Sequence, residues 1–229
     1  MKMSSQAEDG KESLPCGGST NWSTISAAVR DTSNFTLLRC VDTLLNDERL
    51  LREAASRSHR HQLGFVKIVL MTDASGGCLR LHRWDRISPV PEDIHSHCAD
   101  FYSRLVFGKL SEHSFDLIQG NSHARFRYHF DSSIGHSVAL ADGFTGVSLS
   151  SSCELAIGDI YCKKAMQLHN ISNVSQGTLT VSAWKARNSK AIVLKAREAS
   201  AEDCSVPLGM PARELRAVLL NIKDRTIGT

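Results

Sequence analysis

The sequence lacks the features that mark several large classes of protein. No apolar run among the 229 residues approaches the roughly 20 residues needed to cross a bilayer, so we expect no transmembrane helix. The polar residues 1–20 contain no apolar signal-peptide core, which gives secretion no support and predicts a disordered lead-in. An excess of 27 basic over 24 acidic residues is too small to indicate nucleic-acid binding.

The cysteines form no recognisable framework either. There are 7 of them, an odd number, and no Cys-x-x-Cys pair occurs. A disulfide-stapled fold and a thiolate zinc site are therefore both disfavoured. Free thiols in a reducing cytoplasm are the expected state, so we predict a cytoplasmic protein without a membrane or nucleic-acid partner.

Helical patterns occur only towards the two ends of the chain. Apolar residues within 34–57 recur with the period of an amphipathic helix, and the pair Asn46-Asp47 is placed to cap a second, short helix. Near the C-terminus, Pro211 fits a first helical position ahead of an apolar stripe. We therefore predict an N-terminal helical segment at 21–63 and a C-terminal helical extension at 197–229.

The region between them, residues 64–196, has a different character. It consists of short strand-like runs separated by turns rich in Gly, Asn, Asp and Ser. The runs at 65–71 and 78–84 are rich in β-branched residues or alternate between apolar and polar side chains. No helical period interrupts the region, which disfavours βαβ units and predicts an all-β core folded as an antiparallel sandwich or barrel.

Two histidines with one residue between them begin the most informative stretch. If this segment is a strand, His95 and His97 leave it on the same face. Far downstream, His169 follows an extended-looking run that begins at Gly158, and Asn173 lies four residues later. We predict that the three histidines converge on one metal ion, because imidazole suits iron, zinc, copper and nickel.

A second pair, His59 and His61, has the same spacing. It lies in a polar, basic run and lacks β-forming neighbours. We expect this pair in a solvated linker rather than in a metal site.

The two longer motifs resemble those of the cupin superfamily, and the resemblance covers about residues 64–196. The first cupin motif reads Gly, five residues, His-x-His, three or four residues, Glu, six residues, Gly. The second reads Gly, five residues, Pro-x-Gly, two residues, His, three residues, Asn. Six residues of this chain match these spacings: His95, His97 and Gly108 in the first motif, and Gly158, His169 and Asn173 in the second. The resemblance implies a cupin-type double-stranded β-helix, or jelly-roll barrel, around a metal.

Some positions depart from the cupin pattern. Pro89 stands at the first glycine, and Lys164 and Met166 replace the Pro and Gly of the second motif. The glutamate position falls at Phe101 or Tyr102, neither of which is a carboxylate. Loss of this glutamate resembles the cysteine dioxygenase-like, three-histidine branch and a group of uncharacterised cupins near it. That branch implies iron(II) as the cofactor.

Three neutral ligands leave the charge of a divalent metal uncompensated, which favours an anionic ligand such as a thiolate or carboxylate. Arg80, His82 and Arg104 are candidates to bind a substrate carboxylate. Tyr102 is a candidate to donate a hydrogen bond near the metal in place of the lost glutamate. We predict a mononuclear non-haem iron oxygenase resembling thiol dioxygenases, which uses dioxygen and a small polar substrate bearing a carboxylate or thiol.

Two other functions fit the same residues. One is a non-catalytic, metal-dependent sensor or small-molecule binding module. The other is a zinc or nickel cupin with isomerase or lyase chemistry, since zinc acidifies its bound water. The oligomeric state also stays open, with a homodimer as one option.

Overall fold

The protein is described here by a computed structural model that covers residues 22–61, 64–86, 92–131, 136–187, 190–204 and 209–228. The chain begins with α1 (Trp22–Arg30), α2 (Phe35–Asn46) and α3 (Glu48–Arg57), and it ends with a short 3-10 helix, η1 (Ala201–Cys204), and α4 (Ala212–Ile227). The lead-in predicted at 1–20 lies outside the described residues. None of the described helices is long and apolar enough to cross a membrane.

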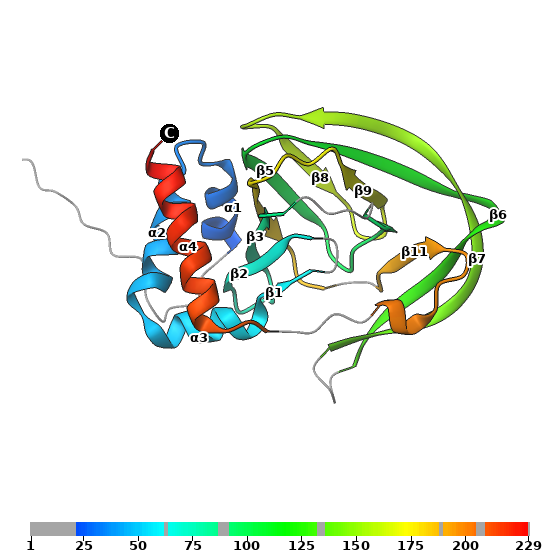
Figure 1. The fold of residues 1–229 in the computed structure, drawn as a ribbon, viewed down its shortest axis with the longest axis horizontal. Coiled ribbons are helices and arrows are strands. Elements are labelled where there is room, and N and C mark those ends of the chain that lie inside the picture. Colours follow the sequence, from blue (N-terminus) through cyan, green and yellow to red (C-terminus); the bar gives the residue numbers. More distant parts are fainter. Residues whose placement is uncertain are drawn as a thin grey trace, which may run out of the picture.

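The strands that lie between the helical ends of the sequence form two antiparallel sheets, which enclose a common interior, and α1, α2, α3 and α4 lie together on one side of them (Figure 1). The helix-side sheet contains, in spatial order, β1 (His59–Arg60), β2 (Val66–Thr72), β3 (Cys78–Trp84), β10 (Thr178–Trp184), β5 (Phe101–Phe107) and β8 (Ile160–Lys163). The far sheet contains β11 (Ile192–Ala196), β4 (Ile94–His95), β9 (Leu168–Ser172), β6 (Leu110–Asp131) and β7 (His136–Leu155). Apolar side chains of both sheets meet between them, including Leu105 from the first and Ile171 from the second.

The strand order identifies the fold. From β3 to β10 the chain crosses between the sheets at every connection except that from β6 to β7. The orders β3-β10-β5-β8 and β4-β9-β6-β7 correspond to strands 1-8-3-6 facing strands 2-7-4-5 of a jelly roll. This topology confirms the predicted cupin-type double-stranded β-helix with helical additions at both ends.

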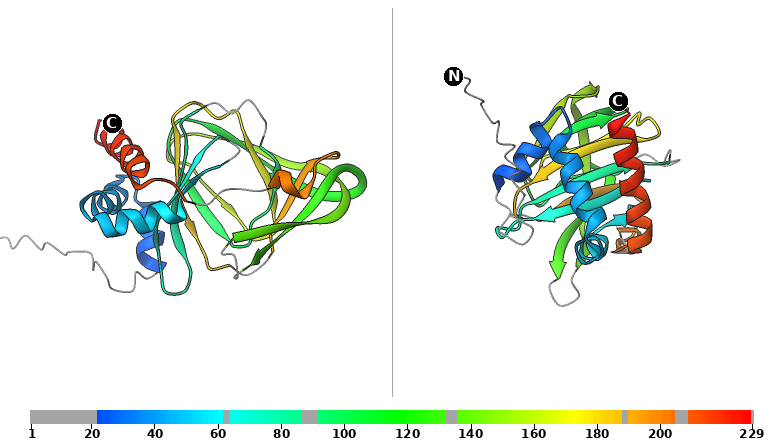
Figure 2. Two further views of the ribbon diagram at one scale, coloured as in Figure 1. Left: turned by 60° about the horizontal axis from the view of Figure 1, so that its bottom comes forward. Right: turned by 90° about the vertical axis from the view of Figure 1, so that its left-hand side faces the viewer.

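The helices cover the outer face of the helix-side sheet (Figure 2). Strands of this sheet alternate, so apolar side chains such as Leu79 and Leu81 point outwards into the helical layer. The residues between them, Arg80 and His82, therefore point into the barrel. Fully buried residues from both layers form this core: Leu37, Val41, Leu51, Leu215 and Leu219 from the helices, and Val66, Ile68, Leu79, Leu81 and Val181 from the strands.

Helix boundaries follow the local signals. The Asp47 carboxylate accepts hydrogen bonds from the backbone amides of Arg49 and Leu50, at 2.9 and 3.0 Å, and so caps α3 as predicted. Pro211 lies one position earlier than predicted, since it is the N-cap of α4 and not its first helical residue.

The expectation of a solvated linker at His59 and His61 is wrong. His59 lies in β1, is only 4% exposed and pairs with Lys67 of β2. The His61 ring stacks on Phe65 with ring centroids 4.5 Å apart, and its backbone amide donates to the Phe65 carbonyl. Pairing with an existing sheet edge supplied the hydrogen bonds that local β-propensity did not predict.

Arg104 joins the helical layer to the sheet. Its Nε donates to the Val29 carbonyl at 2.6 Å, and one Nη donates to the Asp31 carbonyl and to Asn34 Oδ1, each at 2.8 Å. The side chain is 2% exposed and points away from the barrel interior. The prediction that Arg104 binds substrate is therefore wrong, because alternation along β5 directs it to the outer face.

Replacement of this arginine tests its structural role. Arg104→Met removes the Nε donor to the Val29 carbonyl and the Nη donor shared by the Asp31 carbonyl and Asn34 Oδ1, although the Asp31 carbonyl keeps the Asn34 amide as a donor. We expect the variant to lower the free energy of unfolding by about 3 kcal/mol. Urea denaturation followed by circular dichroism measures the change. Arg49→Met is the control, because Arg49 is 74% exposed and forms only a surface ion pair. Equal stability of the two variants would contradict this role.

Candidate metal centre

The three predicted histidines lie together inside the barrel. His95 ends β4, His97 follows two residues later, and His169 lies directly opposite His95 in the pairing of β4 with β9. Their ligand atoms all lie within 4.8 Å of one another. The predicted three-histidine cluster therefore exists, and it is a group able to hold a metal ion.

The ring orientations suit a shared metal. His95 Nδ1 lies 2.9 Å from the Asp93 carbonyl oxygen, which only accepts, so Nδ1 carries the proton and Nε2 keeps a lone pair. His97 Nε2 and His169 Nε2 are 2.9 Å apart. Two nitrogens each about 2.1 Å from one ion, and at right angles around it, would stand about 3 Å apart. The residues present thus fit a mononuclear metal.

Burial keeps these imidazoles neutral. It lowers the pKa of His95 to about 3, with a smaller contribution from His169, and it lowers the pKa of His97 well below the usual value. Burial also lowers the pKa of His169, although the Glu112 carboxylate opposes this shift. Neutral imidazole is the form that binds metal, so the cluster needs no deprotonation at neutral pH.

Hydrogen bonds fix the segment that carries His95 and His97 to β11 and to the segment before His169. Ser96 donates its amide to the Ile192 carbonyl at 2.8 Å, and its hydroxyl accepts from the Ile192 amide at 2.9 Å. The Met166 amide donates to the His97 carbonyl at 3.1 Å, which links the two motifs directly. Met166 has a φ of 69°, so it keeps the left-handed conformation for which the cupin motif uses glycine.

A buried ion pair supports His169 from behind. Glu112 Oε1 lies 3.5 Å from His169 Nδ1 and 2.6 Å from Lys163 Nζ, and Glu112 and Lys163 are 6% and 7% exposed. Burial alone would raise the pKa of Glu112, but His169 and Lys163 together lower it. A carboxylate in this position orients a metal-binding imidazole and increases its basicity.

Aromatic rings line one side of the cluster. Phe101, at the position of the missing glutamate, has its ring 5.0 Å from that of His97 and 4.2 Å from that of Trp184, on which it stacks. The Trp184 ring lies 4.8 Å from His97. These rings replace a charged ligand with an apolar wall.

The remaining predicted residues separate into two groups. Arg80 and His82 lie inside the barrel, where the Arg80 guanidinium covers the Trp184 ring at 4.2 Å from its centroid. Their contact with a substrate stays a prediction. Tyr102 instead points into the helical layer, where it contacts Trp22 and Arg30. The prediction that Tyr102 lies beside the metal is therefore wrong for the same reason as for Arg104, with which it shares a face of β5.

Sequence reasoning missed Glu112, Lys163 and Lys67. Lys67 carries the only charge in the apolar run at 65–71, and a single charge in a buried strand is a signal that was available. Glu112 and Lys163 had no such signal, because only the tertiary pairing of β6 with β9 brings Glu112 to His169.

Comparisons with known proteins add little to this geometry. No protein-family model matches the chain, and no curated protein matches it. Among solved structures it is similar to hydroquinone 1,2-dioxygenase from a Sphingomonas species, crystallised with 4-hydroxybenzoate, at 11% identity and a TM-score of 0.27 over 58% of this chain. The match covers 65% of that enzyme, which is less than two thirds of its length.

A second similar structure is an uncharacterised protein with a double-stranded β-helix domain from Klebsiella pneumoniae. It is 14% identical, with a TM-score of 0.26 over 63% of this chain and 94% of that one. TM-scores this low do not establish a shared fold, so the fold is assigned from the strand order.

The ion pair behind His169 gives a direct test of the site. Glu112→Gln keeps the side-chain shape but removes the charge facing His169 Nδ1, and we expect metal affinity to fall about 10- to 100-fold. Competition with a fluorescent chelator measures the affinity. Glu154→Gln, at an exposed position on β7, is the matched control. Unchanged affinity in Glu112→Gln would show that the carboxylate does not support the ligand.

Proposed function

We propose that this protein is a mononuclear non-haem iron oxygenase in which His95, His97 and His169 hold iron(II). The observation that carries the proposal is the convergence of three neutral imidazoles on one point without a carboxylate among them. This donor set is the one implied by the resemblance to cysteine dioxygenase-like cupins. The substrate we propose is a small polar molecule that bears a carboxylate or a thiol.

The charge of the site supports an anionic substrate. Iron(II) bound there would supply the redox chemistry needed to incorporate dioxygen into a substrate. Three neutral ligands leave its two positive charges uncompensated, so the centre attracts a thiolate or carboxylate. The Arg80 guanidinium, whose central carbon lies 4.2 Å from the centroid of the Trp184 ring, adds a positive charge beside the cluster and can orient a carboxylate through its planar fork.

The surrounding side chains would control access to the reacting atoms. Phe101 and Trp184 exclude water from one side of the cluster, which strengthens electrostatic interactions there. Burial keeps His82 neutral by lowering its pKa well below the usual value. His82 is therefore suited to donate or accept a hydrogen bond rather than to pair as a cation.

Free thiols fit the location that we propose. None of the described cysteines forms a disulfide: they are Cys40, Cys78, Cys98, Cys153, Cys162 and Cys204. Unpaired cysteines are typical of reducing compartments, so we propose a cytoplasmic protein. A homodimer stays a prediction.

Metal analysis followed by oxygen uptake tests the function. Protein expressed without added metal is assayed for its metals, then loaded with iron(II) and supplied with a panel of small thiols and amino acids. We expect about one iron per chain and oxygen uptake that depends on substrate. His169→Ala should lose both the metal and the uptake, because it removes one of three ligands.

Matched measurements separate the alternatives. His123→Ala is the control, since His123 lies in the same sheet outside the cluster and should keep metal and activity. Tight metal with no uptake across the panel would favour a binding module. Zinc or nickel retained without redox activity would favour an isomerase or lyase. Full metal occupancy in His169→Ala would contradict the site itself.

A further inference from the structure

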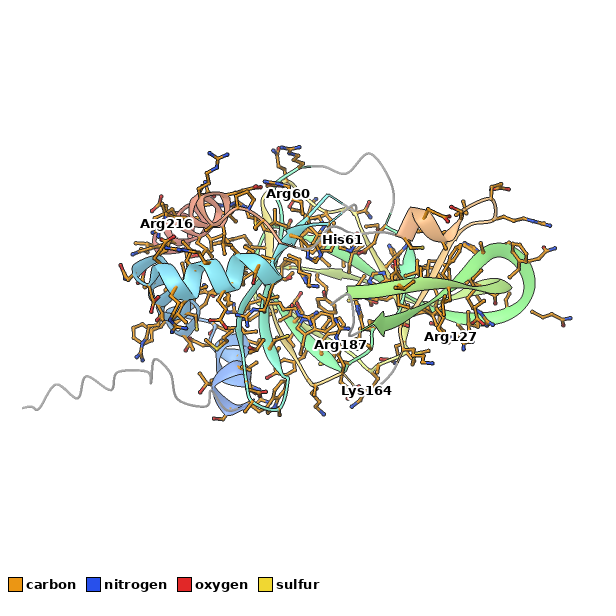
Figure 3. The ribbon with its side chains drawn as sticks, turned by 90° about the horizontal axis from the view of Figure 1, so that it is seen from below. Arg60, His61, Arg127, Lys164, Arg187 and Arg216 are labelled. Atoms are coloured by element: carbon orange, nitrogen blue, oxygen red, sulfur yellow. The ribbon has the colours of Figure 1, made fainter. Side chains whose placement is uncertain are left out.

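The inner face of the helix-side sheet carries a second group of polar side chains, separate from the three histidines. Lys67 of β2 lies directly opposite His82 of β3 and opposite His59 of β1. Arg80 lies two residues before His82 on the same face, diagonal to Lys67 and within reach of a long side chain. His61 follows β1 and lies between the helices and the β6–β7 ribbon (Figure 3).

Neither cation in this group has an acidic partner among the described residues. Lys67 has no hydrogen bond or ion pair there. Arg80 donates only to Cys78 Sγ, at 3.1 Å, and otherwise covers the Trp184 ring.

The nearby carboxylates are already engaged. Glu112 pairs with Lys163, and Asp93 pairs with Lys195 at 2.6 Å. Glu92 accepts a hydrogen bond from the Ile171 amide. The internal segments that the structure leaves undescribed, 62–63, 87–91, 132–135, 188–189 and 205–208, contain no Asp or Glu. Among the acidic side chains that the structure describes, none is therefore paired with Lys67 or Arg80.

Unpartnered polar atoms lie on the neighbouring strand. Thr180, which is fully buried and opposite His82, has no hydrogen-bond partner for Oγ1, and neither does Nε1 of the 3% exposed Trp184. Both residues lie on the inner face of β10, as does Ser182 opposite Arg80. Buried polar groups without partners are uncommon in native proteins, and here they adjoin two unpaired cations.

The surroundings of Lys67 disfavour its charged form. Burial and the neighbouring Arg80 lower the pKa of Lys67 to about 7, so its charged form is destabilised where it stands. Lys67 and Arg80 are both half-buried. A charge withdrawn from water without a partner destabilises the folded state, and such charges cluster at functional sites. A bound anion would satisfy both cations at once.

We propose that Lys67 and Arg80 form a subsite for an oxyanion, a carboxylate or phosphate, on the substrate of the proposed oxygenase. The subsite is separated from the histidine cluster by the indole of Trp184, which lies 4.2 Å from the Arg80 guanidinium and 4.8 Å from the His97 ring. A substrate that spans one aromatic ring reaches both places. The substrate class is therefore a small molecule with two anionic groups, one at the metal and one at Lys67 and Arg80. This inference rests on the proposed function for the role of the metal, but the anion subsite itself does not need the metal.

Calorimetric titration of chelator-treated protein tests the subsite without any metal present. The probes are inorganic phosphate and glutarate, in a buffer without oxyanions. We expect saturable binding of at least one probe, and Lys67→Met or Arg80→Met should weaken it by about tenfold or more, because each removes a charge-assisted hydrogen bond. Lys67→Arg, which keeps the charge, should retain binding. Lys109→Met, at an exposed position, is the matched control and should bind like the unmodified chain.

Thermal unfolding provides an independent readout. Lys67→Met should raise the Tm of the anion-free protein, because it removes a half-buried charge that has no acidic partner among the described residues, whereas the loss of a merely structural lysine would lower the Tm. Unchanged anion affinity in both Lys67→Met and Arg80→Met would overturn the subsite. So would binding that occurs only after metal is added, since the anion would then sit at the histidines alone. Anion binding that depends on metal would refute the subsite but would not refute the metal site. Conversely, if the metal analysis of the proposed oxygenase finds no metal, anion binding to the metal-free protein can still support the subsite. The two failures are therefore distinguishable.

Discussion

The antiparallel pairing of β4 with β9 is the constraint on which the candidate site depends. It places His95 opposite His169, although 73 residues of chain lie between these two histidines, and the amide of Met166 then ties the segment before β9 to His97. A shift of one residue in this register would turn His169 to the other face of its strand. The pairing of β6 with β9 adds Glu112 behind His169. One local arrangement of strands therefore positions both the cluster and its support.

The two faces of the helix-side sheet have different roles: the outer face contributes to the core, and the inner face carries polar side chains. Its outer face is apolar and packs against four helices, with Arg104 joining the layers through three hydrogen bonds. Its inner face carries Lys67, Arg80 and His82 among aromatic rings. The apolar outer layer offsets the cost of holding unpaired charges inside. A barrel of this kind can keep an unfavourable interior because another face of the same strands provides the core.

Neutral imidazoles and unpaired cations give the interior an excess of positive charge in the part of the chain that the structure describes. The ligands contribute no negative charge, and the acids that lie nearby are engaged by Lys163, Lys195 and a backbone amide. We propose that such an interior selects anions through two contacts, one at the histidine cluster and one at Lys67 and Arg80. The proposed metal and the proposed oxyanion subsite thus describe two ends of one binding site for a small dianion.

The sequence by itself determined the strand-rich core, the helical ends and the three histidines, because alternation, helical period and motif spacing are local properties of the chain. It did not determine which face of β5 points into the barrel. The sequence predicts Tyr102 and Arg104 in the site, but both side chains lie under the helices. A period of two identifies two faces of a strand without saying which of them faces the barrel interior. Only the tertiary structure placed Glu112 behind His169 and Lys67 beside Arg80. Glu112 and His169 lie on strands that are distant in sequence, and Lys67 and Arg80 meet only in the register that β2 and β3 adopt. No local pattern in the sequence encodes the register between strands.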